Sequence, residues 1–200
     1  MKRIFQISAV VLLAVLLNSC ELLNEVQKTA TLAKCDFRVA SANNINLAGV
    51  NVQNIKQFSD LTILDGAKLT SAVLKNQFPL DLTVNVEGKN PNASPAGLTS
   101  LDWILFIDDQ QMTQGTLNQA FTIPANNGTA TIPMNMHFDL KQVLSGKSTD
   151  AIINFGLNLA GAGNRPTRIT MKLKPTINVQ GFPLTYPGYI TIGTDFTGLK

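Results

Sequence analysis

Hydrophobic and polar residues alternate along most of the chain, most clearly in the run Leu80–Asn92, LDLTVNVEGKNPN. From Leu80 to Val86 every second residue is apolar and the residues between them are polar. Successive strand side chains point to opposite faces of a sheet, so this run predicts a β-strand with one face on a core and the other in water. It ends at Asn90-Pro91-Asn92, because proline has no backbone N–H to donate to the hydrogen bonds of a sheet and asparagine favours a turn.

Other stretches alternate in the same way and predict a mainly β, antiparallel sandwich or barrel of roughly eight strands. A phase shift across Ala48-Gly49 predicts a bulge at Gly49. Asp108-Asp109-Gln110 predicts a hairpin turn, and Pro175 marks an edge or a bend. One stretch, 101–107, is apolar on both faces and is expected to be covered on both sides, with a helix as a candidate cover. The further strands expected are 37–52, 101–107, 115–123, 130–140, 153–159, 169–179 and 189–192.

Two segments have helical spacing, which gives the fold one or two short helices. Ser59-Asp60 is the expected N-cap of a helix over 61–73, which Gly66 weakens or splits. Asp139 is expected to cap a shorter helix over 140–144 that ends near Gly146.

The first twenty residues have the pattern of a secretory leader. Lys2 and Arg3 precede a largely apolar run of 14 residues, Ile4–Leu17, which is short for a membrane-spanning helix. The run ends in Leu17-Asn18-Ser19-Cys20, which resembles the lipobox of bacterial lipoproteins. An ordinary cleaved signal with a chance cysteine is the alternative.

The lipobox resemblance implies that Cys20 receives a diacylglycerol by thioether, becomes the mature N-terminus and is then N-acylated. Two acyl chains meet the requirement for stable anchoring. We therefore expect a signal peptide at 1–20, a tether or short helix at 21–35 and one β-sandwich domain at 36–200. The expected location is the bacterial cell envelope, with the outer membrane favoured and the periplasmic or surface face left open.

Composition limits the classes of partner. Hydrophobic residues make up 44% of the chain and charged residues 14%, which excludes a disordered chain. Without Lys2 and Arg3 of the leader, the 16 basic residues fall to 14, against 13 acidic residues. This balance predicts no nucleic-acid partner, and no motif predicts a cofactor.

The reactive residue types are sparse. His137 is the only histidine and falls on the polar face of its strand, so we expect neither a metal site nor a hydrolytic triad, and no enzymatic activity. If Cys20 is acylated, Cys35 has no partner for a disulfide. Cys35 is then either a small buried hydrophobe or a reactive thiol.

A row of basic residues runs along the last long strand and the loop before it. This row is a candidate anion-binding face for phosphate or carboxylate groups of an envelope glycan or lipid. The alternative is a solvated strand face with lysines that protect an edge. The row consists of Arg165, Arg168, Lys172 and Lys174.

Several motifs together resemble the group 2 late embryogenesis abundant proteins, also called the water-stress and hypersensitive-response domain. The resemblance covers about residues 37 to 180, and its most specific piece is Asn90-Pro91-Asn92 at the end of a strand. The other pieces are Asn46-Leu47-Ala48-Gly49-Val50, Pro79-Leu80, Leu101-Asp102-Trp103, Gly115 and Ile123-Pro124.

This resemblance implies an immunoglobulin-like or fibronectin-III-like sandwich with a helix, no enzymatic activity and a link to desiccation and other stress. The expected function is that of a lipid-anchored, non-enzymatic envelope protein with a stress-protective or structural role. The alternative is a glycan- or lipid-binding module of the periplasm or cell surface, with a partner that the sequence does not identify.

Overall fold

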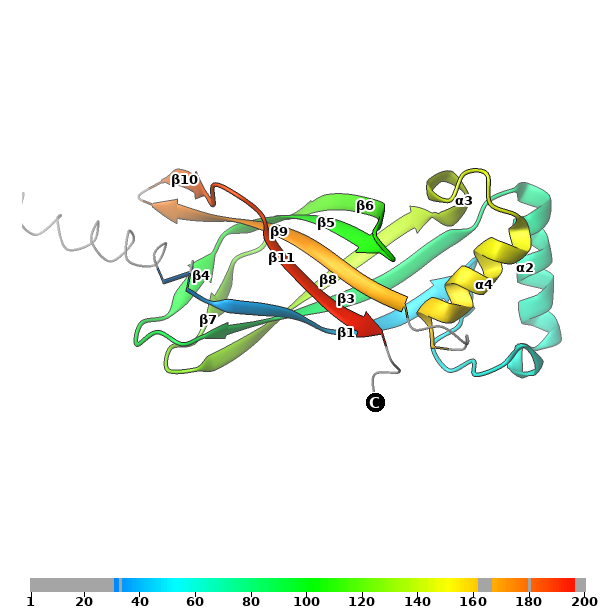
Figure 1. Cartoon of the computed structure of the whole chain (residues 1–200), viewed down its shortest axis with the longest axis horizontal. Helices are drawn as coiled ribbons and strands as arrows, with labels where there is room; N and C mark the ends of the chain where they lie inside the picture. The colour runs from blue at the N-terminus through cyan, green and yellow to red at the C-terminus, as the bar shows by residue number, and fades with distance from the viewer. Residues whose placement is uncertain (1–30, 33, 162–166, 180, 197–200) are drawn as a thin grey trace, which may run out of the picture.

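Antiparallel strands dominate the computed structural model, which describes residues 31–32, 34–161, 167–179 and 181–196. The mainly β antiparallel fold predicted from the alternating pattern is therefore confirmed. Two sheets face each other along the length of the molecule (Figure 1), and their inward-facing side chains form a shared core.

The first sheet contains four strands in the order β2-β1-β3-β8. Its long members are β1 (Asp36–Leu47), β3 (Pro79–Asn90) and β8 (Gly128–Asp139), and β2 (Val50–Asn51) extends the edge. Strand β3 pairs with β8 over its full length, from Pro79↔Asp139 to Asn90↔Gly128. The strand predicted from the alternation at Leu80 is thus the centre of this sheet.

The second sheet contains five strands, in the order β10-β9-β5-β6, with β11 also paired to β9. Its central strands are β5 (Ser100–Ile107) and β9 (Thr167–Val179). The outer strands are β6 (Gln110–Leu117), β10 (Phe182–Thr185) and β11 (Ile190–Phe196). A separate pair is formed by β4 (Ala96–Leu98) and β7 (Phe121–Ile123).

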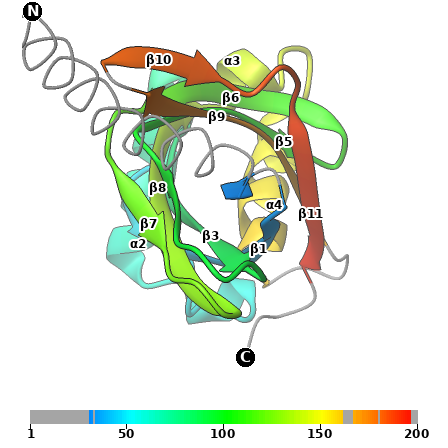
Figure 2. The same cartoon turned by 90° about the vertical axis from the view of Figure 1, so that its left-hand side faces the viewer.

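The described helices lie together at one end of the two sheets (Figure 1). They are α2 (Ile63–Lys75), α3 (Leu140–Val143) and α4 (Thr149–Leu159), and a 3-10 turn, η1 (Phe58–Asp60), precedes α2. The opposite end contains β10, the β4-β7 pair and the first described residues, as the end-on view also shows (Figure 2). The molecule therefore has a helical end and an end where the described chain enters.

The core follows the alternating pattern. Leu80, Leu82, Val84 and Val86 of β3 are each at most 2% exposed. The apolar set of β8, which ends at Phe138, is buried in the same way. Strands β1 and β11 lie side by side, as do β6 and β8, so the two sheets approach each other at both margins.

The segment around Gly49 is a hairpin turn, and the predicted bulge at Gly49 is wrong. Ala48 and Gly49 have φ angles of 49° and 79°, and Leu47 pairs with Val50 on the neighbouring strand. Positive φ at both central residues is the geometry of a two-residue hairpin. The phase shift in the sequence thus reflects a reversal of direction, whereas the irregularities of β1 lie between Val39 and Ser41 and between Asn43 and Asn46.

Helix α2 begins later than predicted, because Thr62, and not Ser59-Asp60, is its N-cap. The Thr62 side chain accepts a hydrogen bond from the Asp65 backbone N–H, and the Asp65 carboxylate accepts from Thr62 in return. The Asp65 carboxylate also accepts a 2.7 Å hydrogen bond from the Thr62 hydroxyl, and this bond, followed by the one from the Thr62 backbone N–H, lowers the pKa of Asp65. Gly66 lies inside the continuous helix and does not split it.

Residues 153–159 form most of helix α4, so the strand predicted there is wrong. Ser148 caps this helix by accepting from the Ala151 backbone N–H, and its buried residues are Ile152, Gly156, Leu157 and Leu159. Ile152, Gly156 and Leu159 are four and three residues apart, which is the spacing of one helix face. The predicted short helix after Asp139 is confirmed as α3.

Three smaller expectations also change. The stretch 115–123 is divided between β6 and β7. Strand β9 is central, and Pro175 lies where its second partner changes from β11 to β10. The second face of β5 is only half-buried, with the Lys172 ammonium 5.0 Å from the Phe106 ring centroid.

Candidate functional site

The Asn90-Pro91-Asn92 turn is confirmed as the end of β3, and its side chains form a closed hydrogen-bond network. The Asn90 side chain is fully buried. Its Nδ2 donates to the carbonyl oxygens of Ser94, at 2.8 Å, and Ile123, at 3.2 Å. Its Oδ1 accepts from the backbone N of Asn92 at 3.0 Å and from Asn92 Nδ2 at 2.8 Å.

Asn92 extends this network to the start of the described chain, because its Nδ2 also donates to the carbonyl oxygen of Thr31 at 3.1 Å. We call Asn90 and Asn92 with the carbonyls of Thr31, Ser94 and Ile123 the asparagine clasp. Since the Asn90 amide makes hydrogen bonds through both its donor and its acceptor atoms, the clasp is a structural feature and offers a ligand no free polar atom of Asn90.

Cys35 lies beside the clasp and is confirmed as a buried residue, with 9% of its surface exposed. Its Sγ donates to the carbonyl oxygen of Thr31 at 3.4 Å, and the cysteine is free of a disulfide. Burial, reinforced by the negative charge of Asp36, raises the pKa of the thiol to about 11. The thiol therefore stays protonated at neutral pH, which favours the buried hydrophobe over the reactive thiol.

Of the predicted basic row, Arg168, Lys172 and Lys174 lie on β9, whereas Arg165 lies outside the described residues. Arg168 meets the β5-β6 turn, where its guanidinium pairs with Asp109 and its backbone N–H donates to Asp108 Oδ1 at 2.9 Å. The charge of Arg168 is thus already paired.

Lys172 and Lys174 each lie near an aromatic ring, and neither forms an ion pair within the part of the chain that the structure describes. The Lys172 ammonium lies 5.0 Å from the ring centroid of Phe106, and the Lys174 ammonium lies 5.8 Å from that of Tyr189. Rings at these distances attract a cation but leave part of it open to solvent. Among the described ion pairs none involves either lysine, so these two are the cations of the row that can receive an anion.

A shallow hollow of about 340 Å³ lies close to these lysines on β5 and β6, although neither lysine lines it. Asp102 lines the hollow and accepts a 2.6 Å hydrogen bond from the Thr116 hydroxyl. Lys174 is the register neighbour of Asp102 on β9, and Tyr189 forms part of the wall. The hollow thus combines a carboxylate, an aromatic ring and an amide, and the residues around it are Asp102, Trp103, Ile104, Gln114, Gly115, Thr116 and Tyr189.

His137 is solvent-exposed, as predicted, and its Nδ1 lies 2.6 Å from Asp81 Oδ1 on the neighbouring strand. No hydroxyl or thiol forms a hydrogen bond to His137 in the part of the chain that the structure describes. The same residues contain no cluster of three or more His, Cys, Asp or Glu side chains suited to a metal ion.

Cys20, the predicted lipidation site, lies outside the described residues. None of the described helices combines the length and the apolar character needed to cross a bilayer.

The fold and the clasp define a β-rich domain whose strand β3 ends in Asn-Pro-Asn. A family model described as late embryogenesis abundant protein (LEA_2) matches residues 83–187, so the chain belongs to this family. The match contains Asn90-Pro91-Asn92, Leu101-Asp102-Trp103, Gly115 and Ile123-Pro124 and begins after the motifs at 46–50 and 79–80.

Comparison with solved structures finds a protein from Archaeoglobus fulgidus, with 13% identity and a TM-score of 0.35 over 61% of this chain and 87% of that one. It also finds a solution structure from Arabidopsis thaliana, with 9% identity and a TM-score of 0.38 over 80% and 76% of the two chains. A further solution structure, of a protein described as late embryogenesis abundant, has 14% identity and a TM-score of 0.37 over 95% and 86%. No curated protein sequence matches the chain.

Two features of the site were not predicted from the sequence. The contact between Asn92 and Thr31 joins residues 61 positions apart, and no local pattern indicates it. Strand β10 is short and uniformly exposed, so it lacks the alternation that identifies a half-buried strand. The Tyr186-Pro187-Gly188 turn that follows was the one local signal near it.

Proposed function

We propose that this protein is a lipid-anchored, non-enzymatic component of the bacterial cell envelope, in which Cys20 carries the lipid and the LEA_2 domain has a stress-protective or structural role. The observation that carries the proposal is the short distance in sequence between the lipobox-like Leu17-Asn18-Ser19-Cys20 and Thr31. Because the asparagine clasp binds the Thr31 carbonyl, an acyl group on Cys20 would hold the domain close to a membrane.

Two local environments support a non-enzymatic role. The raised pKa of Cys35 keeps its thiol protonated, and a thiol is a much weaker nucleophile than a thiolate. The exposed His137–Asp81 pair has no hydroxyl or thiol hydrogen-bonded to it among the described residues, so it lacks the nucleophile that a triad requires.

The anchor is tested by growing cells with an alkyne-tagged fatty acid and isolating the protein from membranes. The unsubstituted chain is expected to carry the tag and to partition into detergent, whereas Cys20→Ala is expected to carry none. Cys35→Ala is the matched control and is expected to be tagged like the unsubstituted chain. An untagged unsubstituted chain would overturn the lipid anchor.

The stress role is tested in a strain that lacks the protein. We expect lower survival after drying or osmotic shock, restored by the unsubstituted gene. Survival equal to that of the parent strain would overturn the stress role and leave the structural one.

The second candidate function is binding of acidic groups on an envelope glycan or lipid. Lys172 and Lys174 favour it because neither has an acidic partner among the described ion pairs. We expect Lys172→Glu with Lys174→Glu to weaken binding to envelope glycans or lipids, and Lys75→Glu with Lys147→Glu, the same charge change at the helical end, to leave it unaffected. Equal binding by both variants would exclude this function for the basic row.

A further inference from the structure

Strand β10 exposes large apolar side chains that the core does not use. Phe182 is 76% exposed and Leu184 is 49% exposed, and Tyr189 on the following turn is 48% exposed. We call these three residues the apolar rim. Phe182 and Leu184 lie two residues apart on the same side of β10, and large apolar side chains exposed next to each other indicate a surface that meets another apolar phase.

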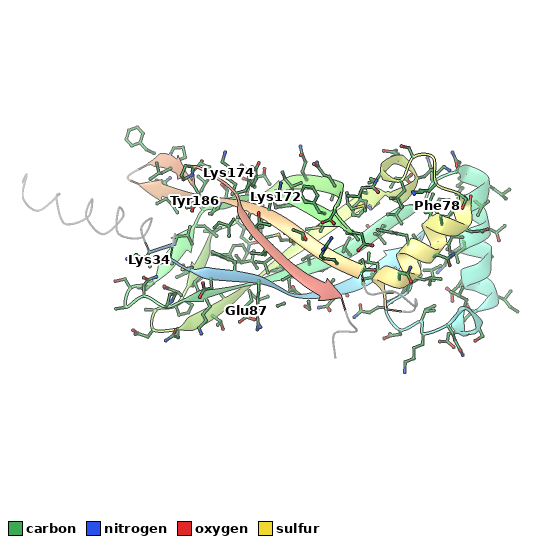
Figure 3. All side chains as sticks on the ribbon, viewed as in Figure 1. Lys34, Phe78, Glu87, Lys172, Lys174 and Tyr186 are labelled. Carbon is green, nitrogen blue, oxygen red and sulfur yellow. The ribbon has the colours of Figure 1, made fainter. Side chains whose placement is uncertain are left out.

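The apolar rim lies at the end of the molecule where the described chain enters. Figure 2 shows β10 at the same end as the first described residues, and Figure 3 shows Lys34, Tyr186 and Lys174 toward this end, opposite Phe78 and the helices. Only residues 21–30 separate Cys20 from Thr31. A chain of this length spans at most about 40 Å when fully extended, so an acyl group on Cys20 keeps this end near the bilayer.

The residues around the rim suit a lipid interface. Tyrosine partitions to the boundary between headgroups and acyl chains, where its hydroxyl stays wet and its ring lies in an apolar environment. Phenylalanine and leucine are the residues that an interfacial surface buries among the acyl chains. The Lys174 ammonium lies over the Tyr189 ring, and Lys34 at the same end is exposed. Lysines beside an apolar surface are attracted to the phosphates of anionic lipids.

We propose that the apolar rim rests in the interfacial region of the phospholipid bilayer that holds the Cys20 anchor, so that the domain meets the membrane at a second, fixed point. This inference relies on the proposed lipid anchor. It commits the domain to an orientation in which β10 faces the lipid and α2, at the helical end, points away from it (Figure 1).

Helix α2 provides a matched control, because it also exposes apolar residues but at the far end. Ile63 is 96% exposed and Leu74 is 82% exposed. If exposed apolar area alone decided membrane contact, α2 would insert at least as readily as β10. A bilayer contact dictated by the tether should instead select the rim.

The experiment uses the full chain, purified with its acyl chains and reconstituted into vesicles of phosphatidylethanolamine and phosphatidylglycerol. Leu184→Cys and, separately, Leu74→Cys are labelled with a fluorophore whose emission increases in an apolar environment. Cys35 is buried and an acylated Cys20 has no free thiol, so the introduced cysteine receives the label. The unsubstituted chain is treated in parallel to verify this.

We expect the label at Leu184 to brighten several-fold and shift to the blue on reconstitution, and to be quenched by brominated lipids. The label at Leu74 is expected to keep its aqueous emission. Unchanged emission from Trp103, the only tryptophan, verifies that both variants are folded.

Flotation of the vesicles separates the two ways of failing. A chain that floats with the vesicles while its Leu184 label stays aqueous overturns the rim contact and leaves the anchor intact. A chain that neither floats nor carries acyl chains overturns both the anchor and the inference. Equal brightening at Leu184 and Leu74 also overturns the inference, because membrane contact would then lack the proposed orientation.

Discussion

Asn90 belongs to the family motif and makes most of the hydrogen bonds of the asparagine clasp. Its fully buried amide satisfies two carbonyl oxygens and two N–H groups. We expect Asn90→Ala to lower the free energy of unfolding by about 3 kcal/mol, because it leaves buried polar groups without partners. Urea titration measures the loss. Asn54→Ala, an exposed control, should stay within about 0.5 kcal/mol of the unsubstituted chain. A loss at Asn90 no larger than this would contradict the structural role of the clasp.

Cys35 makes the stability of the folded protein depend on pH in the alkaline range. Its pKa is raised from 9.0 to about 11 in the folded state, so between these values the folded chain holds a proton that the unfolded chain has released. Stability therefore falls as pH rises through this window, by about 2 kcal/mol from this group. Urea titrations at several pH values measure the slope.

Cys35→Ala removes this thiol while leaving the lysines and tyrosines that also titrate at high pH. We expect the variant to lose less stability across the window than the unsubstituted chain. Parallel pH curves for the two proteins would mean that the folded environment does not hold the proton on Cys35.

At the residue scale, the sequence predicts what depends on near neighbours. The Asn-Pro-Asn turn and the exposure of His137 follow from turn chemistry and alternation, whereas burial was one of two alternatives for Cys35. The partners of these residues do not follow from either, because the hydrogen bond between Asn92 and Thr31 joins residues 61 positions apart, beyond the reach of any local pattern.

At the scale of the elements, substitution by alanine is expected to have opposite effects on stability at two glycines, Gly115 and Gly66. Gly115 on β6 faces Trp103, and an added Cβ would lie 2.6 Å from Trp103 Cζ2. We expect Gly115→Ala to destabilise the protein by about 1–3 kcal/mol and to change the Trp103 emission spectrum, because the ring must move. Urea titration followed by tryptophan fluorescence reports both effects.

Gly66 is the matched control, since an added Cβ there has no heavy atom within 4 Å and the residue lies inside α2. Gly66→Ala should stabilise the chain by up to about 1 kcal/mol through helix propensity. Destabilisation by both substitutions would show that α2 is not the continuous helix described above.

The elements were predicted well where one side of a strand faces water and poorly where spacing is ambiguous. In 153–159 the apolar residues satisfy both a strand and a helix pattern, and tertiary contact decides between them. Gly156 packs so closely against Leu47 that a Cβ would lie 2.6 Å from its Cδ2. The Ser148 cap was the local signal that favoured a helix. At Ala48-Gly49 the alternative of a two-residue hairpin explains the same phase shift that suggested a bulge.

At the scale of the whole molecule, the two ends differ in what they expose. The helical end presents the apolar residues of α2, while the other end combines β10, the asparagine clasp and the start of the described chain (Figure 1). Alternation predicts the sheets between these ends but contains no information about which loops share an end. That arrangement arises from the strand order of the two sheets.

The length of chain between Cys20 and the clasp should control how often the apolar rim meets the bilayer. Insertion of roughly twenty Gly and Ser residues after Glu25 would lower the effective concentration of the rim at the membrane about fivefold, since this concentration falls as the −3/2 power of linker length. We expect the emission of a label at Leu184 to decline toward its aqueous value, while acylation and flotation persist. The label at Leu74 should not respond to the insertion. A Leu184 signal that is independent of linker length would show that the rim's contact does not depend on the short tether.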